Sequence, residues 1–406
     1  MTKLKVTGVE SHETGSRFTS LYFFGLILSG ISIRIIGNVY LGEIILAILT
    51  FDRVLSSRKY PMPKMWRFLI FSGVIWIFAN LIGSIHADKS LTVILISIFT
   101  PILTICCLST CVFFMSKSEN LLFRSVLFFS IGRLIGLLLD PLPYTSSSPW
   151  KFGYGDSVIL LFISCSYFLR FVKIQWMGQM ALGVISLLNQ ARTLAFIVFI
   201  SSLALVPFQK PNKGRLFFLI MGLFVPILYW IYISLGLSGN LGLYEVKRAT
   251  LLTSTDFGPI AARKEFIFSA RAFFESPFLG YGFNPKVDSQ IILSGYQFWA
   301  EQGYPVSNFD PSVLPVHSFL WGALVQGGIF AGLFWIICLV IAIEKVVKIM
   351  EYNRRIRVLI LYSAMAMIFN IVFSPYGAYE RLYVAILMGT LIAIKLNTSN
   401  RESYGI

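Results

Sequence analysis

The chain of 406 residues is long enough for two or three soluble domains, but 56% hydrophobic, 16% aromatic and only 13% charged residues exclude that class of protein. A net charge of +15 would suggest nucleic-acid binding in a soluble chain, whereas in a membrane protein it first indicates orientation. The five cysteines lie in apolar segments without a Cys-x-x-Cys pair, and with only three histidines they predict neither a disulfide scaffold nor a His/Cys metal site.

The apolar segments predict an all-α polytopic transmembrane bundle of about twelve spans, because a span needs roughly 17 to 25 mostly apolar residues. The first is not a cleavable signal peptide, since the chain starts with too long a polar stretch. In chain order the candidates are residues 18–35, 37–52, 67–86, 90–115, 120–139, 157–172, 175–191, 193–209, 215–236, 316–343, 357–374 and 381–396. Nine spans thus fill residues 1–236, one long loop occupies 237–315, and three spans with a tail occupy 316–406.

Lysines and arginines gather in three connections, between spans two and three, eight and nine, and ten and eleven, which all lie on one side of the membrane. The positive-inside rule makes this side cytoplasmic, and both termini fall on it. The cytoplasmic side then holds 22 Lys and Arg against 7 Asp and Glu, and the outer side 12 against 11. Orientation therefore explains the net charge, and no nucleic-acid partner is expected.

The long outer loop at 237–315 is expected to be functional, as structured loops on one face of a bundle usually are. Asp256 and Pro259 predict the start of a helix that ends at Phe274, before Pro277. Apolar residues recur in it at spacings of three to four, at Ile260, Ile267, Ala270 and Phe274. This pattern predicts an amphipathic helix packed against the mouth of the bundle or lying in the headgroup region.

Arginines remain on the outer side, where the positive-inside rule depletes them. They are Arg263 and Arg271 on the loop helix, Arg192 at the turn between spans seven and eight, and Arg34, Arg133 and Arg381 in or beside spans. A guanidinium at membrane depth is costly and is usually paired or functional, and its forked donors suit phosphate oxygens. Two interpretations stay open: an anionic ligand, or contacts with lipid phosphates and with Glu380, Asp140 or Glu275.

His317 lies where the long loop enters span ten. Imidazole titrates near neutrality, so this residue is a candidate to take a proton from a sugar hydroxyl in a transfer reaction. A helix-cap or interfacial role is the alternative.

These residues occur in an order that resembles a known family. Arg263 precedes Pro277-Phe278-Leu279-Gly280-Tyr281-Gly282 by fourteen residues, His317-Ser318-Phe319-Leu320 leads into a glycine-bearing span, and Gln190-Ala191-Arg192-Thr193 stands before span eight. The pattern resembles the bacterial O-antigen polymerase and O-antigen ligase superfamily of polyprenyl-diphosphate-dependent glycosyltransferases, and it covers residues 189–335. Two positions depart from it: Ser318 stands where asparagine is commoner, and Gln326 where the family has glutamate.

The resemblance implies a metal-independent, inverting glycosyltransferase without a cofactor, placed in the bacterial inner membrane. It would polymerise undecaprenyl-diphosphate-linked repeat units of O-antigen or exopolysaccharide at the periplasmic face. Arg192 and Arg263 would be catalytic and would bind the diphosphate together with Arg271. His317 would orient or deprotonate the acceptor hydroxyl, and Gly280 and Gly282 would let the backbone approach the ligand.

The expected partners are the lipid-linked glycan, an acceptor glycan or lipid A core, and membrane lipids, with other polysaccharide-assembly proteins as candidates. An O-antigen ligase that transfers glycan to lipid A core is the close alternative. A lipid-linked oligosaccharide flippase or transporter is a third, but it would have short loops, broken helices and internal repeats.

Overall fold

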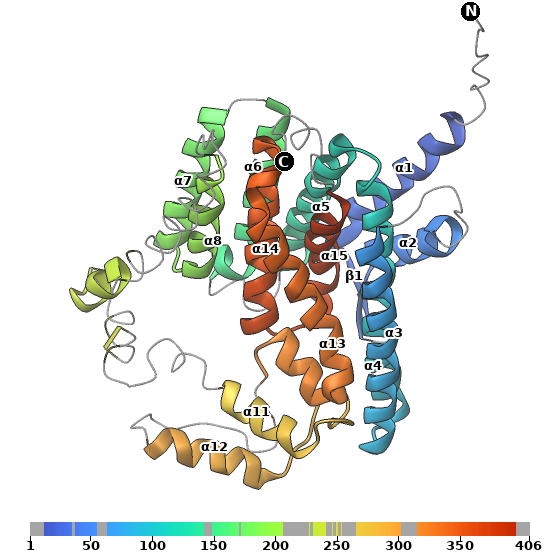
Figure 1. Ribbon diagram of the computed structural model, residues 1–406, viewed down its shortest axis with the longest axis vertical. Coiled ribbons are helices and arrows are strands. Elements are labelled where there is room, and N and C mark those ends of the chain that lie inside the picture. Colours follow the sequence, from blue (N-terminus) through green and yellow to red (C-terminus); the bar gives the residue numbers. More distant parts are fainter. Residues whose placement is uncertain are drawn as a thin grey trace, which may run out of the picture.

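The computed structural model describes residues 12–34, 37–54, 63–141, 148–169, 172–205, 227, 230–240, 246, 249–250, 253, 265–301, 314 and 316–394. Within these ranges the chain forms a bundle of helices with one two-stranded hairpin (Figure 1). The prediction of an all-α membrane-type bundle is confirmed at this level.

The helices and strands follow one another along the chain with these bounds: α1 (His12–Ile27), η1 (Leu28–Gly30), β1 (Ser32–Arg34), β2 (Asn38–Tyr40), α2 (Leu41–Leu49), η2 (Thr50–Val54), α3 (Lys64–His86), α4 (Leu91–Met115), α5 (Glu119–Leu139), η3 (Trp150–Tyr154), α6 (Gly155–Leu169), α7 (Val172–Leu188), α8 (Arg192–Leu203), α11 (Glu265–Glu275), α12 (Ser289–Glu301), α13 (Phe319–Val347), η5 (Ile349–Glu351), α14 (Arg354–Phe373) and α15 (Ala378–Ala393).

Six helices in the described part of the chain are long and apolar enough to cross a membrane. They are Lys64–His86, Leu91–Met115, Glu119–Leu139, Trp150–Leu169, Phe319–Val347 and Arg354–Phe373. Each overlaps one predicted span. Ile174–Leu188 and Arg192–Leu203 are shorter apolar helices, and most of the predicted span 215–236 lies outside the described residues. The number twelve therefore stays a prediction.

The first two predicted spans, 18–35 and 37–52, have different bounds in the structure. α1 ends at Ile27, and the chain continues through η1 into an antiparallel hairpin that pairs Ser32 with Tyr40 and Arg34 with Asn38. The polar residues Arg34 and Asn38 interrupt the apolar run, and strand pairing satisfies their backbone groups where the ends of two helical spans were expected. α2 then contributes only Leu41–Leu49 as α-helix.

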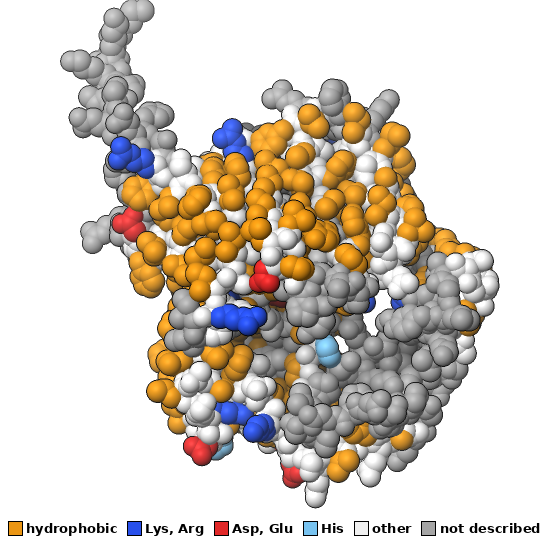
Figure 2. Space-filling model, turned by 180° about the vertical axis from the view of Figure 1, so that it is seen from behind, with side chains coloured by type: hydrophobic (Ala, Val, Ile, Leu, Met, Phe, Trp, Pro, Cys, Tyr) orange, Lys and Arg blue, Asp and Glu red, His pale blue; other side chains and the backbone are white. Residues whose placement is uncertain are grey.

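α3 shows that the bundle has an apolar exterior. Phe71, Phe78, Ile82 and Ile85 are all more than half exposed and recur at helical spacing, whereas Ser72, Asn80 and Ser84 on its other face are buried. A helix of a soluble protein has the opposite arrangement, and small or polar residues are typical of interfaces between membrane helices. Figure 2 shows a broad cover of hydrophobic side chains over the helical part, with charged side chains mostly above and below it.

α11 and α12 lie at one end of the bundle, which we call the loop end (Figure 1). α13 is the central helix at this end. It packs along α3 and α14, while α15 packs on α4 and α14. α11 lies against α13, with the rings of Phe266 and Trp321 4.8 Å apart. Phe268 and Ala272 of α11 form a small core with Ile292 and Tyr296 of α12.

The helix predicted at 256–274 is confirmed in its described part, since α11 ends at Glu275; its predicted start lies outside the described residues. The predicted packing of α11 against the bundle is also present, although Phe274 is 74% exposed. The bounds of α12 were not predicted from the sequence.

Candidate functional site

His317 is exposed and stands directly before the first turn of α13. The next residue, Ser318, fixes this position. Its Oγ accepts a hydrogen bond from the Trp321 amide at 3.1 Å and donates one to the Ile371 carbonyl of α14 at 2.7 Å. Ser318 is therefore both the N-cap of α13 and its link to α14, and a serine serves as anchor where the family pattern has asparagine.

α13 is broken at Gly327 and Gly328, whose backbone angles are not helical. Residues 277–282 cross this break and use the backbone groups that it frees. The amides of Tyr281 and Gly282 donate to the carbonyls of Val325 and Gln326 at 2.8 and 2.9 Å, and the Ile329 amide donates to the Pro277 carbonyl at 2.8 Å. The Pro-x-x-Gly-x-Gly segment is thus joined to α13 by three main-chain hydrogen bonds. We call this contact the crossing.

Gly280 and Gly282 are required by the crossing itself. Their φ angles are +66° and +72°, which glycine adopts without steric cost. A Cβ at Gly280 would lie 2.6 Å from the Gln326 carbonyl oxygen, and one at Gly282 would lie 2.8 Å from the Cα of Ser84 in α3. The two glycines therefore let the segment pass between α3 and α13. Their predicted approach to a ligand stays a prediction.

Arg192 begins α8 and is half-buried, with its guanidinium 4.5 Å from the ring centre of Tyr232. Leu205, just beyond the other end of α8, accepts a hydrogen bond from Arg354 at the start of α14. α8 packs on α14, and the two helices therefore run antiparallel. A helix rises 1.5 Å per residue, so the 12 residues of α8 extend over about 18 Å, whereas α14 is roughly 30 Å long. Arg192 thus lies at the end of α8 nearer the loop end, but deeper in the bundle than Phe373.

Arg271 is half-buried between the two loop helices and donates a hydrogen bond to Ser294 Oγ of α12. Its described contact joins α11 to α12. Arg263 lies outside the described residues. The structure thus brings Arg271, Gly280, Gly282 and His317 to the loop end.

Two other outer arginines are engaged inside the bundle. Arg381 donates to both carboxylate oxygens of Glu43, at 2.6 and 2.7 Å, and to the Asn38 carbonyl at 2.6 Å. Both side chains of this ion pair are buried. The Arg133 guanidinium lies 3.6 Å from the ring centre of Tyr379. The sequence suggested Glu380, Asp140 or Glu275 as pairing partners, whereas the partner of Arg381 is Glu43, which belongs to α2.

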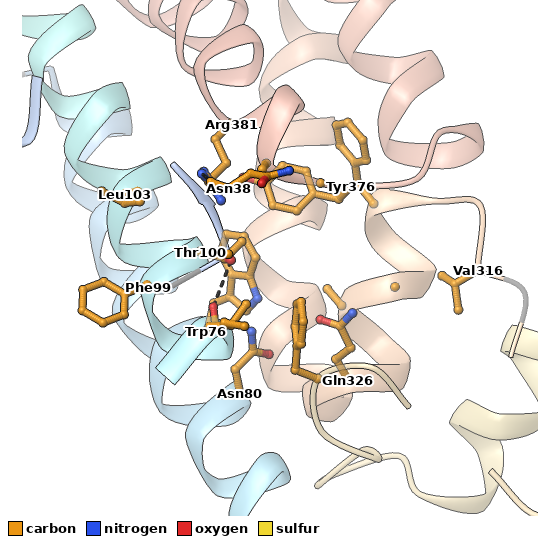
Figure 3. A pocket seen from close by; sticks show the side chains of 18 of the residues that line it. Asn38, Trp76, Asn80, Phe99, Thr100, Leu103, Val316, Gln326, Tyr376 and Arg381 are labelled. Carbon is orange, nitrogen blue, oxygen red and sulfur yellow. Dashed lines mark hydrogen bonds between the residues drawn. The ribbon is translucent and has the colours of Figure 1, made fainter. Parts of the chain in front are cut away.

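A pocket of about 280 Å³ opens beside the His317 segment, between α3, α4, α13 and the start of α15 (Figure 3). Val316, the neighbour of His317, forms part of its wall. Asn80 from α3 and Gln326 from α13 point toward one another across the space. Four mutually packed aromatic residues supply much of the remaining wall: Trp76, Phe319, Trp335 and Tyr376.

Sequence reasoning missed this pocket because its residues come from six separate stretches of the chain. One signal was available: Asn80 is an amide in the middle of an otherwise apolar span, and polar residues at such positions usually have a functional or packing role.

Comparison with family models, with curated proteins and with solved structures finds no match to this chain.

Proposed function

We propose that this protein is a membrane glycosyltransferase that joins undecaprenyl-diphosphate-linked oligosaccharide repeat units at the periplasmic face of the bacterial inner membrane. The observation that carries the proposal is the position of His317. His317 is exposed, Ser318 anchors the chain next to it, and its other neighbour, Val316, lines a pocket with aromatic and amide side chains. This combination suits a base that acts on a hydroxyl of a bound sugar.

In the proposed reaction, the acceptor hydroxyl oxygen attacks the anomeric carbon of the donor as the bond from that carbon to the diphosphate oxygen breaks. His317 takes the hydroxyl proton and passes it to solvent, and undecaprenyl diphosphate leaves with the bonding electron pair. Arg192 and Arg263, helped by Arg271, hold the diphosphate and stabilise its added charge. Attack from the opposite face inverts the anomeric configuration, and no metal ion is required.

A transporter is the second candidate, because the break in α13 is the kind of discontinuous helix that such proteins use to bind substrates. In a transporter the freed backbone groups coordinate the substrate. Here the amides and carbonyls beside Gly327 and Gly328 are bonded to residues 277–282, which favours the transferase over the transporter.

The test is transfer from purified undecaprenyl-diphosphate-linked glycan by protein reconstituted in lipid nanodiscs. His317→Ala, Arg192→Ala and Arg263→Ala should each lower turnover by about 10²-fold or more. Arg34→Ala, which removes an exposed arginine of the hairpin, is the matched control and should leave it unchanged. The residue assignment fails if all three site variants keep wild-type turnover, and metal independence fails if a chelator abolishes turnover and a divalent ion restores it.

The glycan of a deletion strain separates polymerase from ligase. Single-repeat glycan on lipid A indicates that a polymerase was lost, whereas accumulated lipid-linked polymer with bare core indicates a ligase. Reporter fusions after Arg58 and at Lys286 test orientation, since they should report cytoplasm and periplasm respectively.

A further inference from the structure

We infer that the pocket between α3, α4 and α13 is a binding site for one neutral pyranose ring, the terminal sugar of the acceptor glycan. The inference rests on the proposed function for the source of the sugar, while its binding test does not depend on turnover.

The size and walls of the pocket fit a single sugar. A volume of about 280 Å³ is just below the range of small-molecule sites, which is roughly 300–1,000 Å³, so there is room for one ring but not for an oligosaccharide. The rings of Trp335 and Tyr376 lie 4.8 Å apart and those of Trp76 and Trp335 lie 5.3 Å apart. Trp76 and Trp335 are buried behind this wall, and Tyr376 is partly exposed, so the negative face of its ring can attract the slightly positive C–H groups of a pyranose.

Buried polar atoms around the pocket lack partners. The indole Nε1 atoms of Trp76 and Trp335 and the Oδ1 atom of Asn80 are buried without a hydrogen bond, although these side chains line the pocket. The Asn80 amide nitrogen is already used, because it donates to the Ser97 carbonyl at 3.2 Å. These two donors and one acceptor lie just behind the pocket surface, and after small side-chain rotations they match sugar hydroxyls, which both accept and donate. A lipid acyl chain would leave all three unsatisfied, at a cost in free energy.

The charge of the pocket favours a neutral ligand over the diphosphate. Among the described residues that line it, Arg381 is the one charged side chain, and it is paired with the fully buried Glu43. The candidate diphosphate arginines Arg192 and Arg271 are not in its wall. The pocket wall includes Val316, next to His317, the residue proposed to deprotonate the acceptor. The sugar in the pocket is therefore assigned to the acceptor and not to the donor.

The test measures sugar binding by saturation-transfer NMR on the full-length protein in lipid nanodiscs, because maltoside detergents would compete with their own sugar headgroups. The probes are methyl glycosides of glucose, galactose, rhamnose and N-acetylglucosamine. At least one should receive saturation on its ring protons. Trp76→Phe and Asn80→Leu, which remove a donor and an acceptor, should each weaken its binding about 3- to 10-fold. Trp230→Phe, a tryptophan that is 68% exposed, is the matched control and should bind as wild type does.

Three results overturn the inference: no glycoside receives saturation, both pocket variants bind as wild type does, or pyrophosphate or dodecanol displaces the glycoside. Because Trp76→Phe keeps an aromatic ring, it remains informative if Asn80→Leu fails to fold.

Turnover separates this inference from the proposed function. The pocket variants should raise the KM for the acceptor and leave the KM for the donor unchanged. Glycoside binding without any transfer by the wild-type protein would reject the proposed function and keep the sugar site. Transfer with wild-type acceptor KM in both variants would keep the function and reject the sugar site.

Discussion

Replacing Gly328 with alanine should detach the crossing from α13. The backbone of Gly328 has φ +67° and ψ −164°, a region that essentially only glycine occupies, so alanine costs about 1–3 kcal/mol there. The added Cβ would also lie 2.3 Å from the Phe278 carbonyl oxygen, which forces the segment away from the helix. Loss of the three main-chain hydrogen bonds costs about 0.5–1.5 kcal/mol each. The expected local destabilisation is therefore about 3–7 kcal/mol.

Amide hydrogen exchange measures this effect directly, because the amides of Tyr281 and Gly282 are donors in the crossing. Their protection factors should fall by about two orders of magnitude or more in Gly328→Ala. Gly377→Ala is the matched control at the same end of the bundle, since its φ is −145° and a Cβ there has no atom within 4 Å. Wild-type protection at both amides in Gly328→Ala would refute the reasoning, as would an equal loss in the control.

Three further predictions concern stability and pH. Arg381→Met leaves the buried Glu43 without its ion-pair partner, so it should cost about 3–5 kcal/mol, and adding Glu43→Leu should recover most of the melting temperature; no recovery would contradict the pairing. Ser318→Ala should cost about 1–2 kcal/mol by removing a cap and should lower kcat more than it changes KM, because His317 loses its fixed position; a change confined to KM would reject that role. Burial, reinforced by a neighbouring carboxylate, raises the pKa of Tyr281 to about 12. The difference in unfolding free energy between wild type and Tyr281→Phe should therefore be constant below pH 10. As the pH rises from 10 to 12, wild type should lose stability relative to the variant, because Tyr281 ionises first in the unfolded chain; urea unfolding across this range tests it.

Much of the bundle is predictable from the sequence because long apolar runs need no information from the rest of the chain. α3, α4, α5 and α14 follow from segment length and composition alone, and the end of α11 follows from the proline at 277.

The features that shape the site depend on distant residues and were not predictable in this way. The break in α13 lies inside a continuous apolar run, and glycines are common in ordinary membrane helices, so only the partner segment at 277–282 distinguishes it from a plain span. Arg381 and Glu43 are 338 residues apart, and no local periodicity connects them. The pocket likewise depends on the packing of α3 against α13, which are far apart in the sequence.

The main-chain bonding of the crossing determines which parts of the loop can change in sequence. Because its bonds join main-chain atoms, it requires glycine at a few positions and leaves most other side chains free to change. The loop is thus secured before α12 at residues 277–282 and after it at Ser318. Insertions or exchanges between α12 and residue 314 would leave both attachments intact, and with them the placement of His317. Sequence in that stretch can therefore change without altering the two attachments.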